Sequence, residues 1–371
     1  MTDSARSAAV EADYMTRALA LAEHGWGQTA PNPMVGAVVV AGGRIVGEGY
    51  HARYGGAHAE AVALASAAEA ARGATLYVTL EPCAHYGQTP PCVNAIIAAG
   101  IARVVAAVRD PSAVARGGME ILRAAGVGVD VGTERQRAIE LNAAFFNAHA
   151  SRRPWVTLKL ATSADGKIAD PTGVRRWITG LESRREVHRL RANSDAVAVG
   201  IGTVLADDPS LTVRDAPPPR VAPRRVVFDR MLRIPTGSVL VRTSREVQTI
   251  VVAGGGAHGD RQRRLESAGV RIVKANDLVS ALESLRELGI RSLLVEGGAR
   301  LAGAMLGGSL VDRLVIFESV STLGDAALGA FDFAPSGFTS SLAVARVIEE
   351  GRFGLDRMTI YALQNVPCSP D

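Results

Sequence analysis

The sequence predicts an α/β protein made of two different domains. Strand-like and helix-like segments alternate along almost all of its 371 residues, which favours layered domains with mostly parallel sheets. At about 150 residues per domain, this length corresponds to two or three folding units. A polar segment at 147–154, which ends in proline, interrupts the alternation, and no internal repeat relates its two sides. We therefore expect two unlike α/β domains that join at this segment.

The elements of the first domain follow from apolar residues at helical spacing, short apolar runs and glycines that end helices. The domain is expected over residues 14–149, after a flexible N-terminus at 1–13. A Gly42-Gly43 pair between two apolar runs indicates a hairpin. In chain order we expect a helix at 14–24, strands at 35–41 and 44–49, a helix at 58–71, a strand at 74–80, a helix at 92–99, a strand at 101–108, a helix at 119–125, a strand at 127–131 and a helix at 135–142.

The second domain is expected over residues 150–366, before a flexible tail at 367–371. Its short apolar runs and amphipathic segments again alternate, which predicts a second parallel sheet with helices on its faces. In chain order we expect a strand at 155–161, a helix at 183–192, strands at 196–199, 225–228 and 249–253, a helix at 261–268, a strand at 270–274, a helix at 278–288, a strand at 292–295, a helix at 301–306 and a strand at 313–317.

The composition excludes several classes of protein. With 47% hydrophobic residues the chain is neither disordered nor collagen-like. It has no apolar run near 18 residues and no signal-peptide core, so we expect a cytoplasmic protein without a membrane span. The net charge of +4 is spread along the chain, which suits a small phosphorylated ligand better than a nucleic acid. Three cysteines are too few for a disulfide framework and indicate metal binding or inert thiols.

A candidate metal centre lies in the first domain. His58, Cys83 and Cys92 offer three ligands to one zinc ion, which leaves a position for water. We expect both cysteines near helix N-termini, whose partial positive charge favours the thiolate. Glu60 stands two residues after the histidine and can act as general acid and base, which predicts hydrolytic deamination. The pattern H-x-E followed by P-C-x-x-C marks zinc deaminases of nucleobases, although six more residues separate the cysteines here.

Other interpretations of these residues stay open. His58 could be an ordinary helix residue and the cysteines buried thiols. The zinc could also be structural, with His85 or Cys368 as a fourth ligand. His51 lies just upstream of the pattern and is either a turn residue or a substrate contact.

A second candidate site follows strands of the second domain. Gly297-Gly298 opens a helix after a buried strand, so its N–H groups could face a phosphate, although such turns serve packing as often. Gly200 to Gly202 forms another glycine turn, but a GxGxxG fingerprint is missing, which argues against an ordinary Rossmann domain. Asp207 could simply cap a turn. Lys159 on an apolar strand either has an anionic partner or is solvated at a sheet edge.

The motifs of both halves together resemble the bifunctional riboflavin-biosynthesis deaminase-reductases of bacteria. The resemblance covers residues 14–363 and implies a cytidine-deaminase-like three-layer α/β/α domain followed by a dihydrofolate-reductase-like domain. The long spacing between the cysteines is its most discriminating feature. The matching segments are Pro31-Asn32-Pro33-Met34-Val35-Gly36, His58-Ala59-Glu60, Thr79 to Cys83, Thr89-Pro90-Pro91-Cys92, Lys159-Leu160-Ala161, Ser163 to Lys167, Trp177-Ile178-Thr179, Gly202 to Pro209 and Val295 to Gly298.

The family resemblance also implies roles for individual residues. The first domain would deaminate 2,5-diamino-6-(5-phosphoribosylamino)pyrimidin-4-one, with one zinc ion on His58, Cys83 and Cys92. The second would reduce the ribosyl group with NADPH to give 5-amino-6-(5-phosphoribitylamino)uracil. The positions that match NADPH contacts are Ala161, Trp177, Thr203, Asp207, Gly298, Ala299, Arg300 and Leu301. The positions expected to contact substrate are Asn32, His51, Lys159, Arg191, Leu211, Arg214 and Glu296. A homo-oligomer that binds no nucleic acid is also expected.

Two positions depart from the family's usual pattern. Gln88 stands where a basic residue is frequent, so we expect His85 or His51 to hold the substrate phosphate of the deaminase instead. Arg175 stands two residues before Trp177, where a small hydroxyl residue is frequent, so the reductase pocket is expected to differ in shape or charge there.

Two rival functions share some of these features. A nucleic-acid base deaminase with an accessory domain would need a basic surface rich in aromatic residues, but aromatic content is 5% and no Lys/Arg cluster is present. A binding module without catalysis would keep a structural zinc and use its second domain as a nucleotide sensor.

Overall fold

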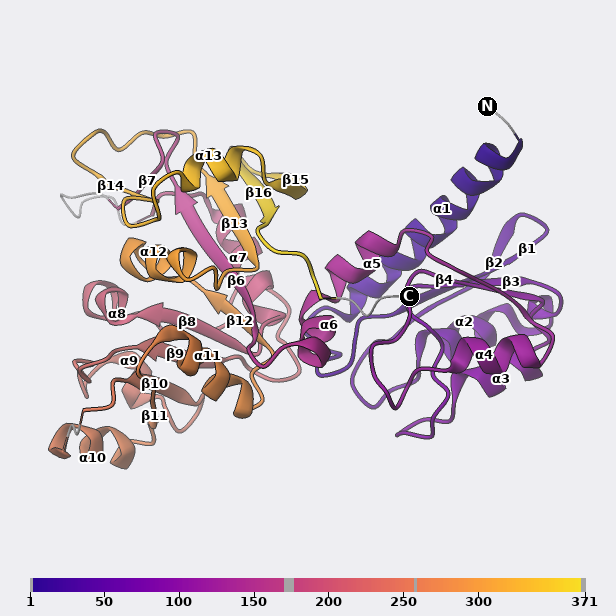
Figure 1. Ribbon diagram of the computed structural model, residues 1–371, viewed down its shortest axis with the longest axis horizontal. Helices are drawn as coiled ribbons and strands as arrows, with labels where there is room; N and C mark the ends of the chain where they lie inside the picture. Colours follow the sequence, from indigo (N-terminus) through magenta and orange to yellow (C-terminus); the bar gives the residue numbers. More distant parts are fainter. Residues whose placement is uncertain (1–2, 170–176, 257–258, 368–371) are drawn as a thin grey trace. The chain divides into compact units, whose positions relative to one another are not determined.

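The two larger sheets of the structure form in two separate parts of the chain, as the alternating segments predict (Figure 1). The computed structural model describes residues 3–169, 177–256 and 259–367, so Arg175 and Cys368 lie outside the described residues. The chain divides into a unit of Met1–Ala150 with Val366–Asp371 and a unit of Ser151–Asn365. Among the described residues, no helix is both long and apolar enough to cross a lipid bilayer.

The first unit is built on a five-stranded sheet in the order β2-β1-β3-β4-β5. The hairpin of β1 and β2 is antiparallel, β1 is antiparallel to β3, and β3, β4 and β5 are parallel. The elements are α1 (Asp3–Ala22), η1 (Glu23–Gly25), β1 (Gly36–Ala41), β2 (Arg44–Tyr50), α2 (Ala59–Ala67), η2 (Ala68–Ala71), β3 (Thr75–Val78), α3 (Cys92–Ala98), β4 (Arg103–Ala106), α4 (Gly118–Ala124), β5 (Gly128–Val131), α5 (Arg135–Leu141) and α6 (Ala143–Ala150).

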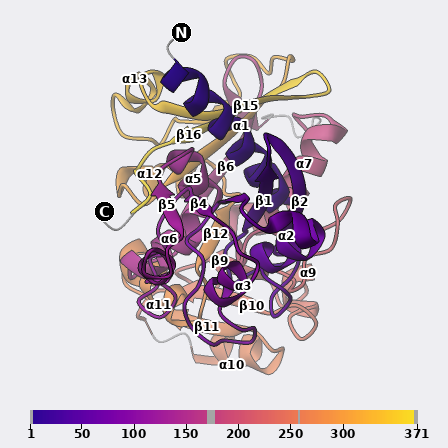
Figure 2. The same cartoon turned by 90° about the vertical axis from the view of Figure 1, so that its right-hand side faces the viewer.

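Helices α1 and α2 cover opposite faces of this sheet. A Cβ atom on Gly36 would lie 1.9 Å from the carbonyl oxygen of Ala18 in α1. A Cβ on Gly49 would lie 2.4 Å from the carbonyl oxygen of Ala59 in α2. Gly49 pairs with Ala37, the residue after Gly36, and successive residues of a strand face opposite sides. The sheet is therefore a middle layer, and α2 and α3 lie beside each other (Figures 1 and 2).

The sequence prediction is wrong at the N-terminal end of the first unit, whereas the division between the units, after Ala150, falls within the predicted segment 147–154. Residues 3–13, expected to be flexible, form the first half of α1. Alanine-rich sequence favours a helix, and Glu11 pairs with Arg103 of β4 at 2.6 Å, which joins this half of α1 to the sheet. The polar segment taken as the domain junction begins inside α6, which ends at Ala150. The polar composition of residues 147–154 did not by itself distinguish the end of a helix from a linker.

The second unit is built on a nine-stranded sheet in the order β11-β10-β9-β8-β12-β6-β13-β16-β15. All neighbours from β11 to β13 are parallel, and β16 and β15 add an antiparallel edge. The elements are β6 (Trp155–Thr162), β7 (Lys167–Ala169), α7 (Leu181–Ala192), β8 (Ala196–Gly200), α8 (Ile201–Asp207), β9 (Arg224–Phe228), α9 (Val239–Arg242), β10 (Thr249–Ala253), α10 (Gly259–Ser267), β11 (Arg271–Lys274), α11 (Leu278–Glu287), β12 (Ser292–Val295), α12 (Ala299–Gly307), β13 (Arg313–Glu318), β14 (Leu328–Gly329), α13 (Phe338–Ala343), β15 (Arg346–Phe353) and β16 (Asp356–Ala362).

Both faces of this sheet are covered by apolar residues, which explains why its strands appear in the sequence as continuous hydrophobic runs. Along β8, Ala196 and Ala198 belong to one core cluster, whereas Val197 and Val199 belong to another. The two clusters lie on opposite faces because side chains alternate along a strand. Helices must therefore cover both faces, as in other largely parallel sheets.

The sequence analysis missed the hairpin of β15 and β16. The residues of β15 are exposed or half-buried and include Arg346, Glu349, Glu350 and Arg352, so the segment shows no apolar run. Charged side chains are common on an edge strand because they discourage pairing with another chain. Residues 200–209 are expected to form turns, but α8 occupies Ile201–Asp207.

We expect Gly36→Ala to lower the free energy of unfolding by about 1–3 kcal/mol, because the added methyl group would overlap the backbone of α1. Urea unfolding followed by circular dichroism measures the change. Gly128→Ala is the matched control, since its Cβ would make only ordinary contacts with the neighbouring strand, the nearest at 3.5 Å. Equal unfolding midpoints for the two variants would contradict the close packing of α1 on β1.

Candidate functional site

Three predicted zinc ligands converge in the first unit. The candidate ligand atoms of His58, Cys83 and Cys92 all lie within 4.8 Å of one another. His58 is the N-cap residue of α2, Cys83 follows β3, and Cys92 is the first residue of α3. The His58 Nδ1 atom lies 3.5 Å from the Sγ of Cys83 and 3.3 Å from that of Cys92. One nitrogen and two sulfurs therefore face a single point.

Cys92 begins α3 at a helix N-terminus, as the sequence predicts, whereas Cys83 does not. Cys83 lies in a loop rather than at a helix N-terminus. The N-terminus of α3 nevertheless reaches it, because the Cys92 backbone N–H donates to the Cys83 Sγ at 3.3 Å. The hydrogen bond from the Cys92 thiol lowers the pKa of Cys83 to about 4 and raises the pKa of Cys92. A divalent cation in place of the shared proton would stabilise two thiolates, so this donor set fits zinc.

The other ring nitrogen of His58 has its own partner. Its Nε2 lies 3.2 Å from the hydroxyl oxygen of Thr89, which belongs to the loop between the two cysteines. With Nδ1 as the metal ligand, Nε2 carries the proton and donates it to that oxygen. Metal-bound histidines commonly donate their second N–H in this way, which fixes the tautomer and the orientation of the ring.

Glu60 lies in the first turn of α2, and its side chain is buried. Burial raises the pKa of the Glu60 carboxyl group. This shift brings the pKa of Glu60 closer to neutral pH. A general acid and base needs such a pKa, because it must both take up and release a proton.

Asn32 and His51 lie next to the same cluster. The His51 Nδ1 donates to the carbonyl oxygen of Ala57 at 3.0 Å, so Nε2 is an acceptor, and the Asn32 amide lies 3.4 Å from it. The rings of His51 and His58 meet edge to face with centroids 5.4 Å apart. Burial lowers the pKa of His51. Both predicted substrate contacts therefore border the candidate metal centre.

No fourth ligand joins the cluster among the residues that the structure describes. His85, one of the two residues proposed to close the site, is absent from the group, and its buried Nδ1 atom has no hydrogen-bond partner there. Gln88, the other unusual residue of the loop, donates its amide to the Tyr54 hydroxyl at 3.0 Å. The described residues thus leave the metal one open position, which catalysis needs.

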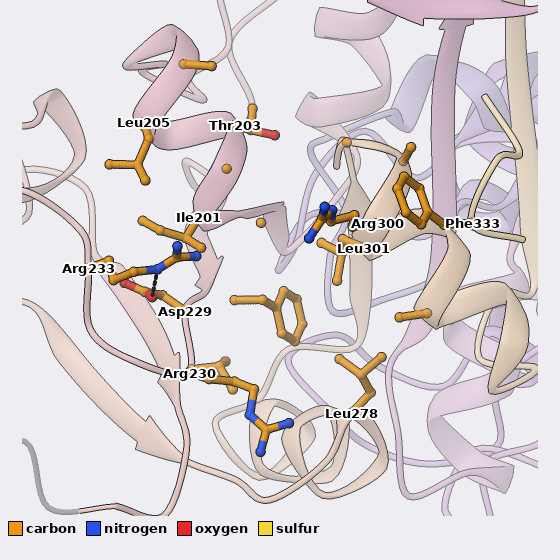
Figure 3. A pocket seen from close by; sticks show the side chains of 18 of the residues that line it. Ile201, Thr203, Leu205, Asp229, Arg230, Arg233, Leu278, Arg300, Leu301 and Phe333 are labelled. Atoms are coloured by element: carbon orange, nitrogen blue, oxygen red, sulfur yellow. Dashed lines mark ion pairs between the residues drawn. The ribbon is translucent and has the colours of Figure 1, made fainter. Parts of the chain in front are cut away.

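The second unit contains a large pocket of about 1530 Å³ (Figure 3). It lies where β8, β9, β10 and β12 end and where α8 and α12 begin, which is where α/β sheets usually bind ligands. Of the predicted cofactor contacts, Thr203, Asp207, Gly298, Ala299, Arg300 and Leu301 line it.

Two predicted cofactor contacts are not among the residues that line this pocket. Ala161 lies on β6, where it pairs with Phe317 of β13. Trp177 is 60% exposed, and the guanidinium carbon of Arg184 lies 4.9 Å from the centre of its ring. Ile178, the residue that follows Trp177 in the chain, does line the pocket.

A charged cluster lies near the carboxyl ends of β6 and β12. Arg191 donates to both carboxylate oxygens of Glu296, at 2.6 and 2.9 Å, and to the carbonyl oxygen of Thr212. Burial opposes ionisation of Glu296, but Arg191 and Lys159 hold the pKa of this carboxyl below its usual range. Burial also lowers the pKa of Lys159, an effect that Glu296 opposes. Since β6 lies between β12 and β13, Lys159 is not the edge lysine of the alternative interpretation.

The remaining predicted substrate residues lie near Arg191. The Arg214 backbone N–H donates to the Nδ1 of His188, and this arginine is exposed. Burial lowers the pKa of His188, and Arg191 and Arg214 lower it further. Leu211 is 3% exposed and packs in a core cluster with a left-handed backbone (φ +53°). Any ligand contact of Leu211 would therefore come from its backbone.

Comparison with known proteins accounts for both halves of the chain. The family described as "Cytidine and deoxycytidylate deaminase zinc-binding region" matches residues 9–108, and the "RibD C-terminal domain" family matches residues 154–346. The riboflavin biosynthesis protein RibD of Aquifex aeolicus is 46% identical over 319 residues, which cover 85% of this chain and 88% of that protein. The chain belongs to the RibD family.

Other RibD proteins extend the similarity. RibD of Escherichia coli K12 is 41% identical over 332 residues, which cover 85% of this chain and 89% of that one. A solved structure of Acinetobacter baumannii RibD has a TM-score of 0.80 at 35% identity and covers 96% of this chain and 99% of its own. The same values hold for a Thermotoga maritima protein described as a diaminohydroxyphosphoribosylaminopyrimidine deaminase/5-amino-6-(5-phosphoribosylamino)uracil reductase.

These findings confirm the fold class that the sequence predicts, with a cytidine-deaminase-like domain followed by a RibD reductase domain. They also confirm that the chain is a bifunctional deaminase and reductase of riboflavin biosynthesis. The similarity includes both domains in one order, so the second is not an accessory domain attached to a nucleic-acid base deaminase.

Several residues of both sites were missed by the sequence analysis. Thr89 was noted only as part of a motif, although its spacing from Cys92 places it in the loop beside the ligands. In the second unit, Asp229, Arg230 and Asn276 line the pocket because they follow β9 and β11. The sequence signal for these three was the end of a parallel strand, since those ends meet at one edge of the sheet.

We expect Thr89→Val to weaken zinc binding about 10- to 100-fold, because the His58 Nε2 would lose the oxygen that orients its ring. Thr89→Ser keeps the hydroxyl group and serves as the matched control. Competition with a chromogenic chelator measures the affinity without requiring activity. Equal zinc affinities for the valine and serine variants would show that Thr89 does not position His58.

Proposed function

We propose that this chain catalyses two successive reactions. The first domain deaminates 2,5-diamino-6-(5-phosphoribosylamino)pyrimidin-4-one, and the second reduces the ribosyl group of the product to give 5-amino-6-(5-phosphoribitylamino)uracil. The observation that carries the proposal is the convergence of His58, Cys83 and Cys92 beside a buried glutamate, in a chain of the RibD family. The substrates follow from the description of the Thermotoga maritima relative.

In the deaminase domain, the three converging side chains would hold one zinc ion per chain. Zinc supplies a Lewis acid there that makes water a stronger nucleophile. Glu60 accepts a proton from the attacking water and delivers it to the leaving amine, for which its raised pKa is suited. Asn32 and His51 border the cluster and orient the pyrimidine ring, and the buried His51 stays neutral because its pKa is lowered.

The loop between the cysteines offers residues that can contact the deaminase substrate. Gln88 is hydrogen-bonded to Tyr54, and His85 presents a ring nitrogen without a partner among the described residues. We assign the contact with the substrate phosphate to His85 rather than to Gln88, because the His85 ring nitrogen has no partner among the described residues, whereas the Gln88 amide already donates to Tyr54.

In the reductase domain, NADPH supplies the hydride. The glycosylamine of the substrate can open to an imine, whose carbon accepts that hydride, so the protein mainly aligns the two reactants. The glycine turn at Gly298 and the start of α8 offer backbone N–H groups to the cofactor phosphates. Lys159 and Glu296 place a cation and an anion where β6 and β12 end, next to the turn that opens the pocket.

The structure changes the proposed role of Arg191. The sequence predicts that Arg191 contacts substrate, and a guanidinium suits a phosphate, but Glu296 and Thr212 already accept hydrogen bonds from three of its five N–H groups. We therefore assign the phosphate to the exposed Arg214 and give Arg191 the task of fixing the Glu296 carboxylate. Burial lowers the pKa of Lys159, and the Glu296 carboxylate opposes that effect and so favours the charged ammonium group.

Ammonia release from the phosphoribosylated pyrimidine, followed by loss of NADPH absorbance, tests both reactions with the purified chain. Transfer RNA serves as the control substrate. Activity on transfer RNA alone, or full zinc loading without any turnover, would overturn the proposal.

Glu60→Gln is expected to lower the rate of ammonia release at least 100-fold, because the amide cannot transfer the proton. Zinc content and reduction of the deaminated intermediate should stay at the level of the unaltered chain. Glu69→Gln, an exposed change shortly after α2, is the control and should alter none of the three. Ordinary deamination by Glu60→Gln would remove the assigned role from Glu60.

Lys159→Met is expected to lower the reductase rate about 100-fold while ammonia release stays unchanged, because the substrate loses a fixed cation in a poorly solvated place. NADPH oxidation with the deaminated substrate measures the effect. Lys274→Met, at the exposed end of β11, is the control. An unchanged reductase rate in Lys159→Met would exclude this lysine from the site.

We further propose a reducing, cytoplasmic location and a homo-oligomeric state. Cys83 and Cys92 are free thiols close to each other, and they bind metal only while they stay reduced. The oligomer is an expectation of the family resemblance, and light scattering of the purified chain measures its mass.

A further inference from the structure

Residues 211–215 form neither helix nor strand, yet they carry Leu211 and Arg214, two of the predicted substrate contacts. Leu211 and Asp215 have left-handed backbones, with φ values of +53° and +51°. A residue other than glycine keeps such a conformation only where its surroundings impose it. The contacts that hold this segment therefore decide where Arg214 lies.

Three contacts hold the segment. The Leu211 side chain is buried in a core cluster. The Thr212 carbonyl oxygen accepts a hydrogen bond from Arg191 at 2.9 Å. The Arg214 backbone N–H donates to the Nδ1 of His188 at 3.1 Å. The contact with His188 thus acts directly on the residue that we propose for the substrate phosphate.

Helix α7 presents His188 to the segment from a fixed position. His188 and Arg191 stand three residues apart on this helix, so they are neighbours on one face. The start of the helix is held by Asp356 of β16, which accepts the Gly180 N–H at 2.7 Å. Val187 packs in a core cluster with residues of β13 and β16. The His188 ring, which is 7% exposed, is therefore a buried and firmly held acceptor.

The hydrogen bond requires His188 to be neutral. A backbone N–H can only donate, so Nδ1 must offer a lone pair and Nε2 must carry the ring's proton. The charged groups that act on this ring are Arg191 on the same helix, Arg214 and Asp215 on the segment, and Glu296 after β12. Burial lowers the pKa of His188, and the two arginines lower it further, whereas the two carboxylates oppose the shift. The neutral ring is therefore the form present at neutral pH.

We propose that neutral His188 is a positioning residue of the reductase domain, which holds Arg214 in place for the substrate phosphate and releases it when the ring is protonated. This inference rests on the proposed contact between Arg214 and that phosphate. A protonated ring would point its Nδ1–H at the Arg214 N–H, so neither donor would have its acceptor. The charge on the imidazolium would also repel the neighbouring arginines.

Reductase kinetics of the purified full-length chain test the inference. NADPH oxidation at saturating NADPH gives kcat and KM for the deaminated intermediate between about pH 5 and pH 8. His188→Leu removes the acceptor, whereas His188→Asn keeps an acceptor oxygen near the Nδ1 position and does not titrate. Arg214→Gln tests the phosphate contact itself. Arg185→Gln, at an exposed position of α7, is the matched control, and thermal unfolding verifies the fold of each variant.

His188→Leu should raise KM about 10-fold at every pH and leave kcat nearly unchanged, because the unpaired N–H no longer holds the segment. His188→Asn should keep KM close to that of the unaltered chain at about pH 8. Acidification weakens binding in every variant, since a phosphate monoester takes up a proton near pH 6. Below about pH 6.5 the unaltered chain should lose about 10-fold more affinity than His188→Asn, which lacks the titrating ring.

An unchanged KM in His188→Leu would overturn the inference, and so would the same dependence of KM on pH in the unaltered chain and in His188→Asn. A fall in kcat at constant KM would assign His188 to the chemical step instead. If Arg214→Gln keeps the KM of the unaltered chain, the proposed phosphate contact is wrong. If Arg214→Gln raises KM and His188→Leu does not, only this inference fails.

Discussion

Two cysteine sulfurs held next to each other need a cation, and the first domain is arranged around that requirement. One proton shared between Cys83 and Cys92 leaves a buried negative charge beside His58 and Glu60, in a place with little water to stabilise it. A divalent ion resolves this conflict, and it also explains why the ring of His58 is held from its far side by Thr89. The middle sheet supplies the rigidity, because the three candidate ligands stand at the starts of α2 and α3 and in the loop that follows β3.

The reductase domain meets a different requirement, which is to hold a long anionic cofactor and a phosphorylated substrate at one edge of a sheet. Parallel strands end together there, and the loops that follow them bring backbone N–H groups and arginines to one pocket. The paired hydrogen bonds from Arg191 to the Glu296 carboxylate are part of the same arrangement. A carboxylate fixed by a guanidinium keeps a constant charge beside Lys159, so the polarity of this region is set before any ligand binds.

The two domains position the residues of their candidate sites in the same way. In each, a sheet buried on both faces provides a fixed frame, and residues of the candidate site stand on the first turn of a helix or just before it. His58, Glu60 and Cys92 occupy such places in one domain, and Gly298 and Thr203 in the other. Groups at these positions are held by the frame and still reach the ligand, which explains how two unrelated reactions suit similar layered folds.

The sequence by itself determined the class of the fold, the chemistry of the candidate metal ligands and most strands of the two larger sheets, because these depend on local periodicity and on residue type. It could not determine that residues 3–13 are helical or that β15 and β16 close the larger sheet, since an ion pair with Arg103 and an exposed edge leave no apolar pattern. Only the tertiary structure showed that Thr89 lies next to His58, that Arg191 is hydrogen-bonded to Glu296 and that Asp229 and Arg230 line the pocket. Each of these depends on which loops the folded sheets bring together, and sequence spacing does not encode such distances.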